Sequence, residues 1–476
     1  MSLEKHHITA QIDRVRLSQK LAFGLGAMVS VIAINAVAGL VQLYLNVGLK
    51  LSPILVGVVM MIPRFWDAVT DPAVGHLSDN TRSRWGRRIP YVFVGAIVVG
   101  VTYALLFTIP RNWGSNTMLI YFTVMSILFY TGITIYSIPQ QSLGLEMTND
   151  YHERTRIFSY AAFFTLIGGF ALPWFYWLAN RSCFADEVEG LRWVAICVGT
   201  VLMACGLTCS IVCKEGKRQQ AMHQTKTGFG ESFGATIKNH TFLLLISVII
   251  MVAVGFALVS GFGSYVTIYY LYGGDKNAAS TLIGVFGTVW AGAGLLGIYP
   301  MNWISSRIGK RKTVMIFLVV MAAGSLMKFY CYNKTYPYLS LIPAVLLSCG
   351  WLVLGTLGVS MMADICDEEE LRSGIRREGI YTAAYGWWLK LGLAIGPFIC
   401  GFILESTGFD AKLDVQSEHS LLLIRAWDIF LPVVICLAAV FAMKRYPITE
   451  ERAYEVKALL EERKKEKQEN IQEELE

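Results

Sequence analysis

Long apolar runs of about twenty residues alternate with short polar segments along most of the chain. A run of this length can cross a bilayer as a helix, and it must be helical because lipid cannot hydrogen-bond an open backbone. The pattern therefore predicts an all-α membrane protein. We place twelve spans at residues 21–45, 54–77, 90–109, 118–146, 157–179, 192–213, 242–271, 280–303, 313–333, 339–363, 381–404 and 423–443.

The one long polar stretch between spans divides the twelve into six plus six. Two halves of equal size suggest an internal repeat. The charged tail is expected to be a solvated helix or a disordered end. The predicted organisation is an N-terminal segment (1–20), a six-helix bundle (21–213), a central loop (214–240), a second six-helix bundle (241–443) and the tail (444–476).

Composition and charge agree with this class. Hydrophobic residues make up 54% of the chain and charged residues 16%, against roughly 25% charged residues in soluble proteins. Most of the 41 lysines and arginines fall on one set of alternate segments, which places both termini in the cytoplasm. The net charge of +6 is spread over short loops and does not indicate nucleic-acid binding. We therefore expect a multi-pass protein of the inner or plasma membrane.

Asp67 and Asp71 carry the most informative chemistry. They lie four residues apart near the end of the second span and so share one helix face, as does Arg64. Ionisable groups inside a span are costly and usually mark an ion or substrate path. Two like charges on one face must be protonated, neutralised by a cation, or paired with a basic side chain. The pair therefore indicates a proton or Na⁺ site, with a static ion network as the alternative.

The loop after the second span is the second informative feature, through Gly75, Asp79, Gly86, Arg87 and Arg88. A similar but less complete motif, residues 306–312, occupies the equivalent loop in the second half. These charges are expected to form a gate by pairing, unless they serve only as a topology signal.

Other charged residues near span ends have simpler expected roles. Glu146 can pair with one of the loop arginines. Asp364 and Arg377 are expected to form the corresponding gate in the second half. The alternative is that their loop is simply solvated. Lys328 and Glu405 sit near span ends, where long side chains can snorkel to water.

Several of these motifs occur in the order typical of one family. The sequence resembles the glycoside–pentoside–hexuronide:cation symporters, the melibiose-permease-like branch of the major facilitator superfamily. The resemblance covers residues of about 18 to 445, and its motifs are residues 20–26, 64–72, 81–88, 138–139, 146–148, 153–155, 363–367 and 374–379, with Lys390 after them.

The resemblance implies the major facilitator fold, in which two six-helix pseudo-symmetric halves surround a central site. It also implies a coupling-cation site of Asp67 and Asp71 on the second span, Thr134 on the fourth and Lys390 on the eleventh. These acids would be the metal ligands if the coupling ion is Na⁺. The alternative is an ion network with Arg64 that only holds helices together.

The family's charged sugar-site positions differ in this chain, which carries Val31, Ser137, Gln141 and Ala162 there. Polar and aromatic side chains remain that suit sugar hydroxyls and ring faces, although amides can equally join helices and aromatics can pack. Lys390 is a counter-charge for an acidic sugar. The substrate-binding candidates are Asn35, Gln42, Ser137, Gln141 and Tyr385.

The sequence thus predicts a secondary active transporter that couples Na⁺ or H⁺ to uptake of a sugar, glycoside or hexuronide. The alternatives are a lysolipid:cation symporter and, from another class, a non-transporting sensor or a membrane enzyme. No nucleophile–base pair or Walker-type loop occurs, which argues against catalysis and against ATP. We expect no cofactor beyond the coupling ion, a small-molecule solute and the bilayer as partners, and a monomer.

Overall fold

The computed structural model describes residues 14–475 except 149, 216–238 and 375–376. Within these residues the chain forms helices joined by turns and loops, with no strand. The chain divides into two compact units. Unit 1 comprises Met1–Gln224, Gly274–Gly287 and Leu404–Gln416, and unit 2 comprises Thr225–Gly273, Thr288–Ile403 and Ser417–Glu476.

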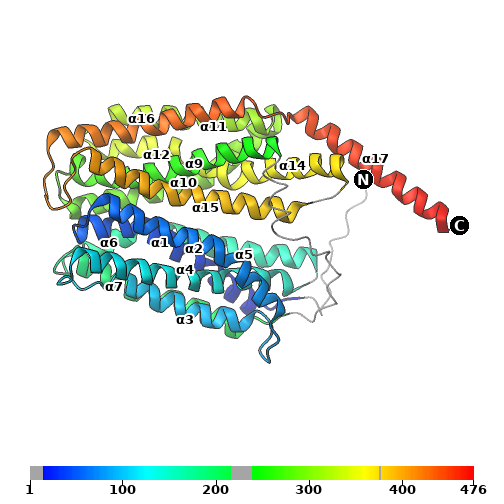
Figure 1. The fold of residues 1–476 in the computed structure, drawn as a ribbon, viewed down its shortest axis with the longest axis horizontal. Helices are drawn as coiled ribbons and strands as arrows, with labels where there is room; N and C mark the ends of the chain where they lie inside the picture. The colour runs from blue at the N-terminus through cyan, green and yellow to red at the C-terminus, as the bar shows by residue number, and fades with distance from the viewer. Residues whose placement is uncertain (1–13, 149, 216–238, 375–376, 476) are drawn as a thin grey trace. The chain divides into compact units, whose positions relative to one another are not determined.

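Unit 1 is built around α3 and α4. In Figure 1, α3 lies alongside α7, and it packs on both α7 and α4, while α1 packs on α5 and α7, and α2 packs on α4. Its core is aromatic, with Tyr103, Phe129 and Tyr136 fully buried. The helices are α1 (Leu17–Gln42), η1 (Leu43–Gly48), α2 (Pro53–Asn80), α3 (Ile89–Leu106), α4 (Ser115–Glu146), α5 (Tyr151–Ala171), α6 (Trp174–Ala179) and α7 (Glu187–Val212).

Unit 2 is built around α11, α16 and α9. Helix α16 packs on both α11 and α9, and a continuous apolar core joins them to α14 and α15. The helices that lie wholly or mainly in unit 2 are α9 (His240–Tyr265), η2 (Val266–Leu271), α10 (Lys276–Ile308), α11 (Lys310–Cys331), η3 (Pro337–Ser340), α12 (Leu341–Leu347), α13 (Cys349–Leu352), η4 (Val353–Leu357), α14 (Gly358–Ser373), α15 (Glu378–Ser406), α16 (Glu418–Met443) and α17 (Glu450–Leu475). The part of α10 up to Gly287 and the part of α15 from Leu404 belong to unit 1.

The all-helical membrane fold is confirmed. In the part of the chain that the structure describes, eleven helical stretches are long and apolar enough to cross a membrane. The predicted fifth span is interrupted, because α5 ends at Ala171 and α6 begins at Trp174. Pro173 lies in this break, where it has no N–H to continue the helical hydrogen bonds. A count of twelve spans is consistent with these helices and stays a prediction.

The charged tail is helical, as one of the two expectations had it, but it is not wholly solvated. It forms α17, and one side of this helix is buried against α14 through Val456 and Leu460. Arg463 adds a hydrogen bond of 3.1 Å to the carbonyl of Leu371. The two apolar side chains lie four residues apart on one helical face, which explains why a mostly charged helix is docked and not wholly solvated.

Candidate functional site

The two acids of α2 face the interior of unit 1. Asp67 is only 3% exposed, and Asp71, one turn further along the helix, is half-buried. Helix α2 packs on α4 along this face. The four-residue spacing therefore places both carboxylates against the same neighbouring helix, as the sequence predicts.

Thr134 of α4 lies between the two acids. Its Oγ1 is 2.9 Å from Oδ1 of Asp67 and 3.1 Å from Oδ1 of Asp71. These two carboxylate oxygens are therefore within about 6 Å of each other, the sum of the two distances. Thr134 is fully buried. The residues predicted from the second and fourth spans thus meet at one point, which we call the Asp67 cluster (Asp67, Asp71, Thr134 and Thr70).

Several oxygen atoms surround the Thr134 hydroxyl in the Asp67 cluster. The Thr134 hydroxyl is also 3.1 Å from the carbonyl oxygen of Tyr130 and 3.5 Å from Oγ1 of Thr70. A hydroxyl carries one proton, so it can donate to only one of the carboxylate and carbonyl oxygens around it. A proton or a hard cation such as Na⁺, which prefers oxygen ligands, would relieve this crowding of negative oxygens. The residues present therefore fit a small cation.

Two neighbouring side chains add to the contact between α2 and α4. Trp66 donates from Nε1 to Oγ1 of Thr131 at 2.8 Å. The guanidinium of Arg64 lies over the Tyr130 ring, 4.7 Å from its centroid. Arg64 thereby has a packing role in addition to its charge.

Two predicted site residues belong to unit 2. Lys390 lies on α15 and is partly buried, and its approach to the acids stays a prediction. Tyr385 lies in the core of unit 2, only 5% exposed, and its hydroxyl donates to the carbonyl of Leu354. In this structure Tyr385 packs within unit 2, and its predicted contact with substrate stays a prediction. Tyr381 and Tyr385 lie four residues apart on one helix face, and both are buried, but the sequence alone could not tell that this face packs into the core.

The remaining substrate candidates lie on α1 and α4 of unit 1. Asn35 is exposed and donates from Nδ2 to the carbonyl of Val31 at 2.8 Å, within its own helix. Gln141 is exposed, whereas Gln42 and Ser137 are half-buried. All four therefore have some accessible surface, and their role in substrate binding stays a prediction.

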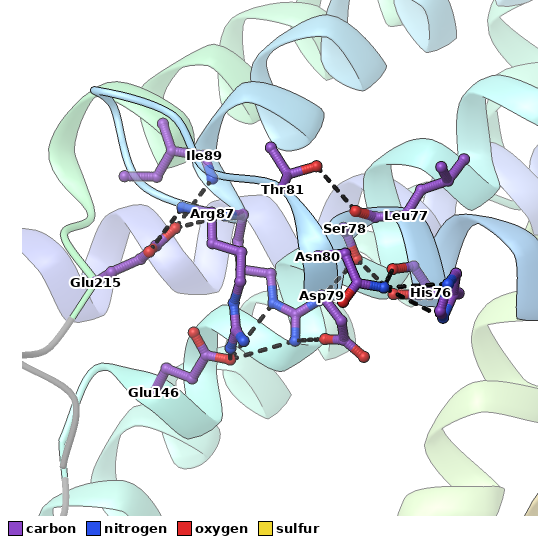
Figure 2. Close-up of polar contacts among 12 residues, drawn as sticks. His76, Leu77, Ser78, Asp79, Asn80, Thr81, Arg87, Ile89, Glu146 and Glu215 are labelled. Carbon is purple, nitrogen blue, oxygen red and sulfur yellow. Dashed lines mark hydrogen bonds and ion pairs between the residues drawn. The ribbon is translucent and has the colours of Figure 1, made fainter. Parts of the chain in front are cut away.

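Four of the predicted gate residues of the first half come together at the ends of α2, α3 and α4 (Figure 2), namely Asp79, Gly86, Arg87 and Arg88. Arg88 donates to Asp79 and Glu146 and, at 2.7 Å, to Oγ of Ser78. Arg87 also pairs with Glu146. The expected pairing of Glu146 with a loop arginine is confirmed. We call this group, with Glu215, the Arg88 cluster.

Glu215 is a member that sequence reasoning missed. Its carboxylate accepts the backbone N–H groups of Arg87 at 2.8 Å, Arg88 at 2.5 Å and Ile89 at 3.3 Å (Figure 2). These belong to the start of α3, where N–H groups lack partners within the helix. Gly86 makes room for it, with φ of +105° and a Cβ position that would lie 2.6 Å from Oε1 of Glu215. Glu215 lies 126 to 128 residues along the chain from these N–H groups, so the sequence alone could not predict the contact.

Replacing Glu215 with alanine should lower the free energy of unfolding by about 0.5–2 kcal/mol, the usual cost of losing a helix cap. Thermal unfolding of the purified protein measures this. The control is Glu418→Ala, which removes an exposed acid from the first turn of α16. Equal effects of the two substitutions would show that Glu215 does not act as a cap.

The second half has a related but simpler arrangement. Lys310, at the start of α11, pairs with Asp364 of α14 at 2.6 Å. Arg377 approaches Glu369 at 4.0 Å. Gly309 precedes α11 with φ of +81°, as Gly86 precedes α3, and Glu450 lies against it. The weak sequence similarity between the two loops therefore corresponds to similar local structure.

Lys328 corrects one expectation. It is 2% exposed and does not reach water, because its Nζ donates to Oδ1 of Asp428 at 2.8 Å. Asp428 is fully buried and also accepts the hydroxyl of Tyr332 at 2.6 Å. Glu405 is exposed but accepts from Oγ of Ser52 at 2.7 Å. Both span-end residues thus have partners distant in sequence.

One further contact joins two of the motifs. Lys20, at the start of α1, pairs with Glu153 of α5 at 2.6 Å. Glu153 is fully buried and also accepts the backbone N–H of Val15 at 3.0 Å. The sequence shows the lysine and the glutamate in separate motifs. Only the packing of α1 on α5 shows that the two side chains form an ion pair.

Comparisons with known proteins agree with this architecture. The chain is 24% identical to the "Uncharacterized symporter sll1374" of Synechocystis, covering 92% of this chain and 95% of the relative. It is 25% identical to the isoprimeverose transporter of Lactiplantibacillus pentosus, covering 89% and 87%.

Among solved structures, a bacterial homolog of the human lysosomal transporter Spinster, in an inward-facing and occupied conformation, matches with a TM-score of 0.69 at 14% identity. The match covers 91% of this chain and 97% of that one, and it shows the major facilitator fold. The family model described as MFS/sugar transport protein matches residues 22–450. The chain is therefore a membrane transporter that belongs to the MFS/sugar transport protein family.

Proposed function

We propose that this transporter couples the entry of Na⁺ or H⁺ to the uptake of a sugar or glycoside. The Asp67 cluster would hold the coupling ion. The observation that carries this proposal is that the Thr134 hydroxyl lies within 3.1 Å of both Asp67 and Asp71, which brings two carboxylates to one point beside a buried oxygen ligand. The family and the sugar transport named for one relative support the choice of solute.

The cycle would follow alternating access, in which the two halves rock about the substrate site. Ion binding would favour the state that binds solute, and solute would raise the affinity for the ion by the same factor. The Arg88 cluster would act as a gate on the cytoplasmic side, with both termini on that side. In this scheme Lys390 approaches the two acids and responds to their occupancy.

Uptake into liposomes that contain the purified protein tests this function. A panel of neutral glycosides, pentosides, hexuronides and a lysophospholipid is offered, with Na⁺ and pH gradients imposed one at a time. We expect one gradient to drive accumulation of a sugar. Accumulation of the lysophospholipid alone would assign a lipid substrate, and a failure of both gradients to drive any solute would contradict symport.

A further inference from the structure

A cavity of about 270 Å³ lies within unit 2, apart from the residues assigned to ion coupling. Its walls come from the end of α10, the start of α11, α14 and the first turns of α17. The first turns of α17 form one of its walls, so the cavity depends on the contact between α17 and α14. Its volume suits a small polar headgroup rather than a drug-sized molecule.

The charges that line the cavity do not cancel. Lys310 is neutralised by Asp364, whose two oxygens lie 2.6 and 2.8 Å from its Nζ, and the same Nζ is 3.3 Å from the carbonyl of Ser360. The other lining charges are those of Arg311, Lys457 and Glu450. Apart from the paired Lys310 and Asp364, the lining therefore has two positive side chains and one negative side chain, so its net charge is positive.

Two hydrogen bonds to backbone carbonyls hold the guanidinium of Arg311 in place. Its Nε donates to the carbonyl of Met443 at 3.3 Å, and its Nη2 donates to the carbonyl of Lys444 at 2.5 Å. These bonds fix the planar group at the cavity wall. A guanidinium has five N–H donors, so donors remain for a ligand, and this geometry suits phosphate oxygens.

The rest of the lining adds neutral groups that hydrogen-bond phosphate or its ester. Lys457 is exposed on α17 and adds an ammonium to the lining. The neutral polar groups come from α10, from the segment before α17 and from α17 itself. They are Asn302, Ser305, Ser306, Thr449 and Tyr454.

We propose that this cavity binds the phosphate group of a small phosphate ester, with Arg311 and Lys457 as its charged contacts. The ester is either the headgroup of an anionic membrane lipid or a soluble molecule such as glycerol phosphate. Because Arg311 begins α11 and Lys457 belongs to α17, the bound phosphate joins the two helices. Binding therefore stabilises the docked position of α17.

The test uses the full-length protein in detergent, titrated with glycerol 3-phosphate and, separately, with inorganic phosphate. A ligand that binds only the folded protein raises the unfolding temperature, and above its dissociation constant the rise grows with the logarithm of the ligand concentration. We expect such a concentration-dependent rise, and we expect Lys457→Gln to weaken binding at least about tenfold, because a charged hydrogen bond is lost. Lys465→Gln, which removes another exposed lysine of α17 outside the cavity, should leave it unchanged.

A second arm places the protein in nanodiscs of phosphatidylcholine alone or with phosphatidylglycerol. Stabilisation by phosphatidylglycerol that depends on Lys457, without a response to soluble esters, identifies a lipid headgroup. The reverse result identifies a soluble ligand. Stabilisation that is absent in both arms, or that Lys465→Gln removes as fully as Lys457→Gln, would overturn the proposal. Both lysines are exposed, so the variants should fold.

Discussion

Asp67→Asn should abolish accumulation of solute against its gradient while leaving the protein folded. Asparagine keeps the shape of the side chain and the contact with Thr134 but removes the negative charge that attracts the ion. A coupling free energy of about 1–3 kcal/mol corresponds to about 5–150-fold in affinity, and its loss should bring the accumulation ratio to about one. Uptake into liposomes under an imposed ion gradient measures this ratio.

Two comparisons make the result specific. Asp71→Asn should behave like Asp67→Asn, because both acids contact the same hydroxyl. Asp414→Asn alters an acid with 77% of its side chain exposed and should keep full accumulation. If Asp67→Asn still accumulates solute with unchanged ion dependence, the coupling ion binds elsewhere.

Lys328→Met should cost about 3–5 kcal/mol of unfolding free energy, because it leaves the buried carboxylate of Asp428 without its charged partner. The pair joins α11 to α16 at a place where neither side chain reaches water. Asp428→Leu should be similarly damaging, since it strands the ammonium. Denaturant or thermal unfolding of the purified protein measures both effects.

The double variant Lys328→Met/Asp428→Leu distinguishes the loss of the ion pair from a general loss of packing. Replacing both charges by apolar groups of similar volume is often neutral, so the double variant should be more stable than either single one. The exposed pair of Lys50 and Asp414 is the control, because screened surface pairs contribute little. If the double variant lost as much unfolding free energy as the two single variants together, the two charges would not stabilise each other.

Local periodicity was enough to predict much of the fold and the centre of the candidate site. The spans follow from the length of the apolar runs, and the common face of Asp67 and Asp71 follows from their spacing of four residues. Resemblance to a family added Thr134, which the structure places beside both acids. These features depend on a single helix, or on one pairing of helices that the family resemblance supplies.

The contacts that sequence did not predict join distant residues. Asp428 lies 100 residues from Lys328, and Glu215 lies more than 120 residues from the start of α3. Tyr385 points into the core although its neighbours in sequence look equally suited to a binding surface. A single sequence gives the chemistry of each side chain, but the partner is selected by tertiary packing.

The most direct test of the account counts the cations that the purified protein takes up, as bound Na⁺ or as protons, when it binds its sugar. The account predicts that the wild-type protein takes up at least about one cation for each sugar, and that Asp67→Asn/Asp71→Asn takes up none. The same cation uptake in the double variant would contradict the assignment of the coupling ion to these acids.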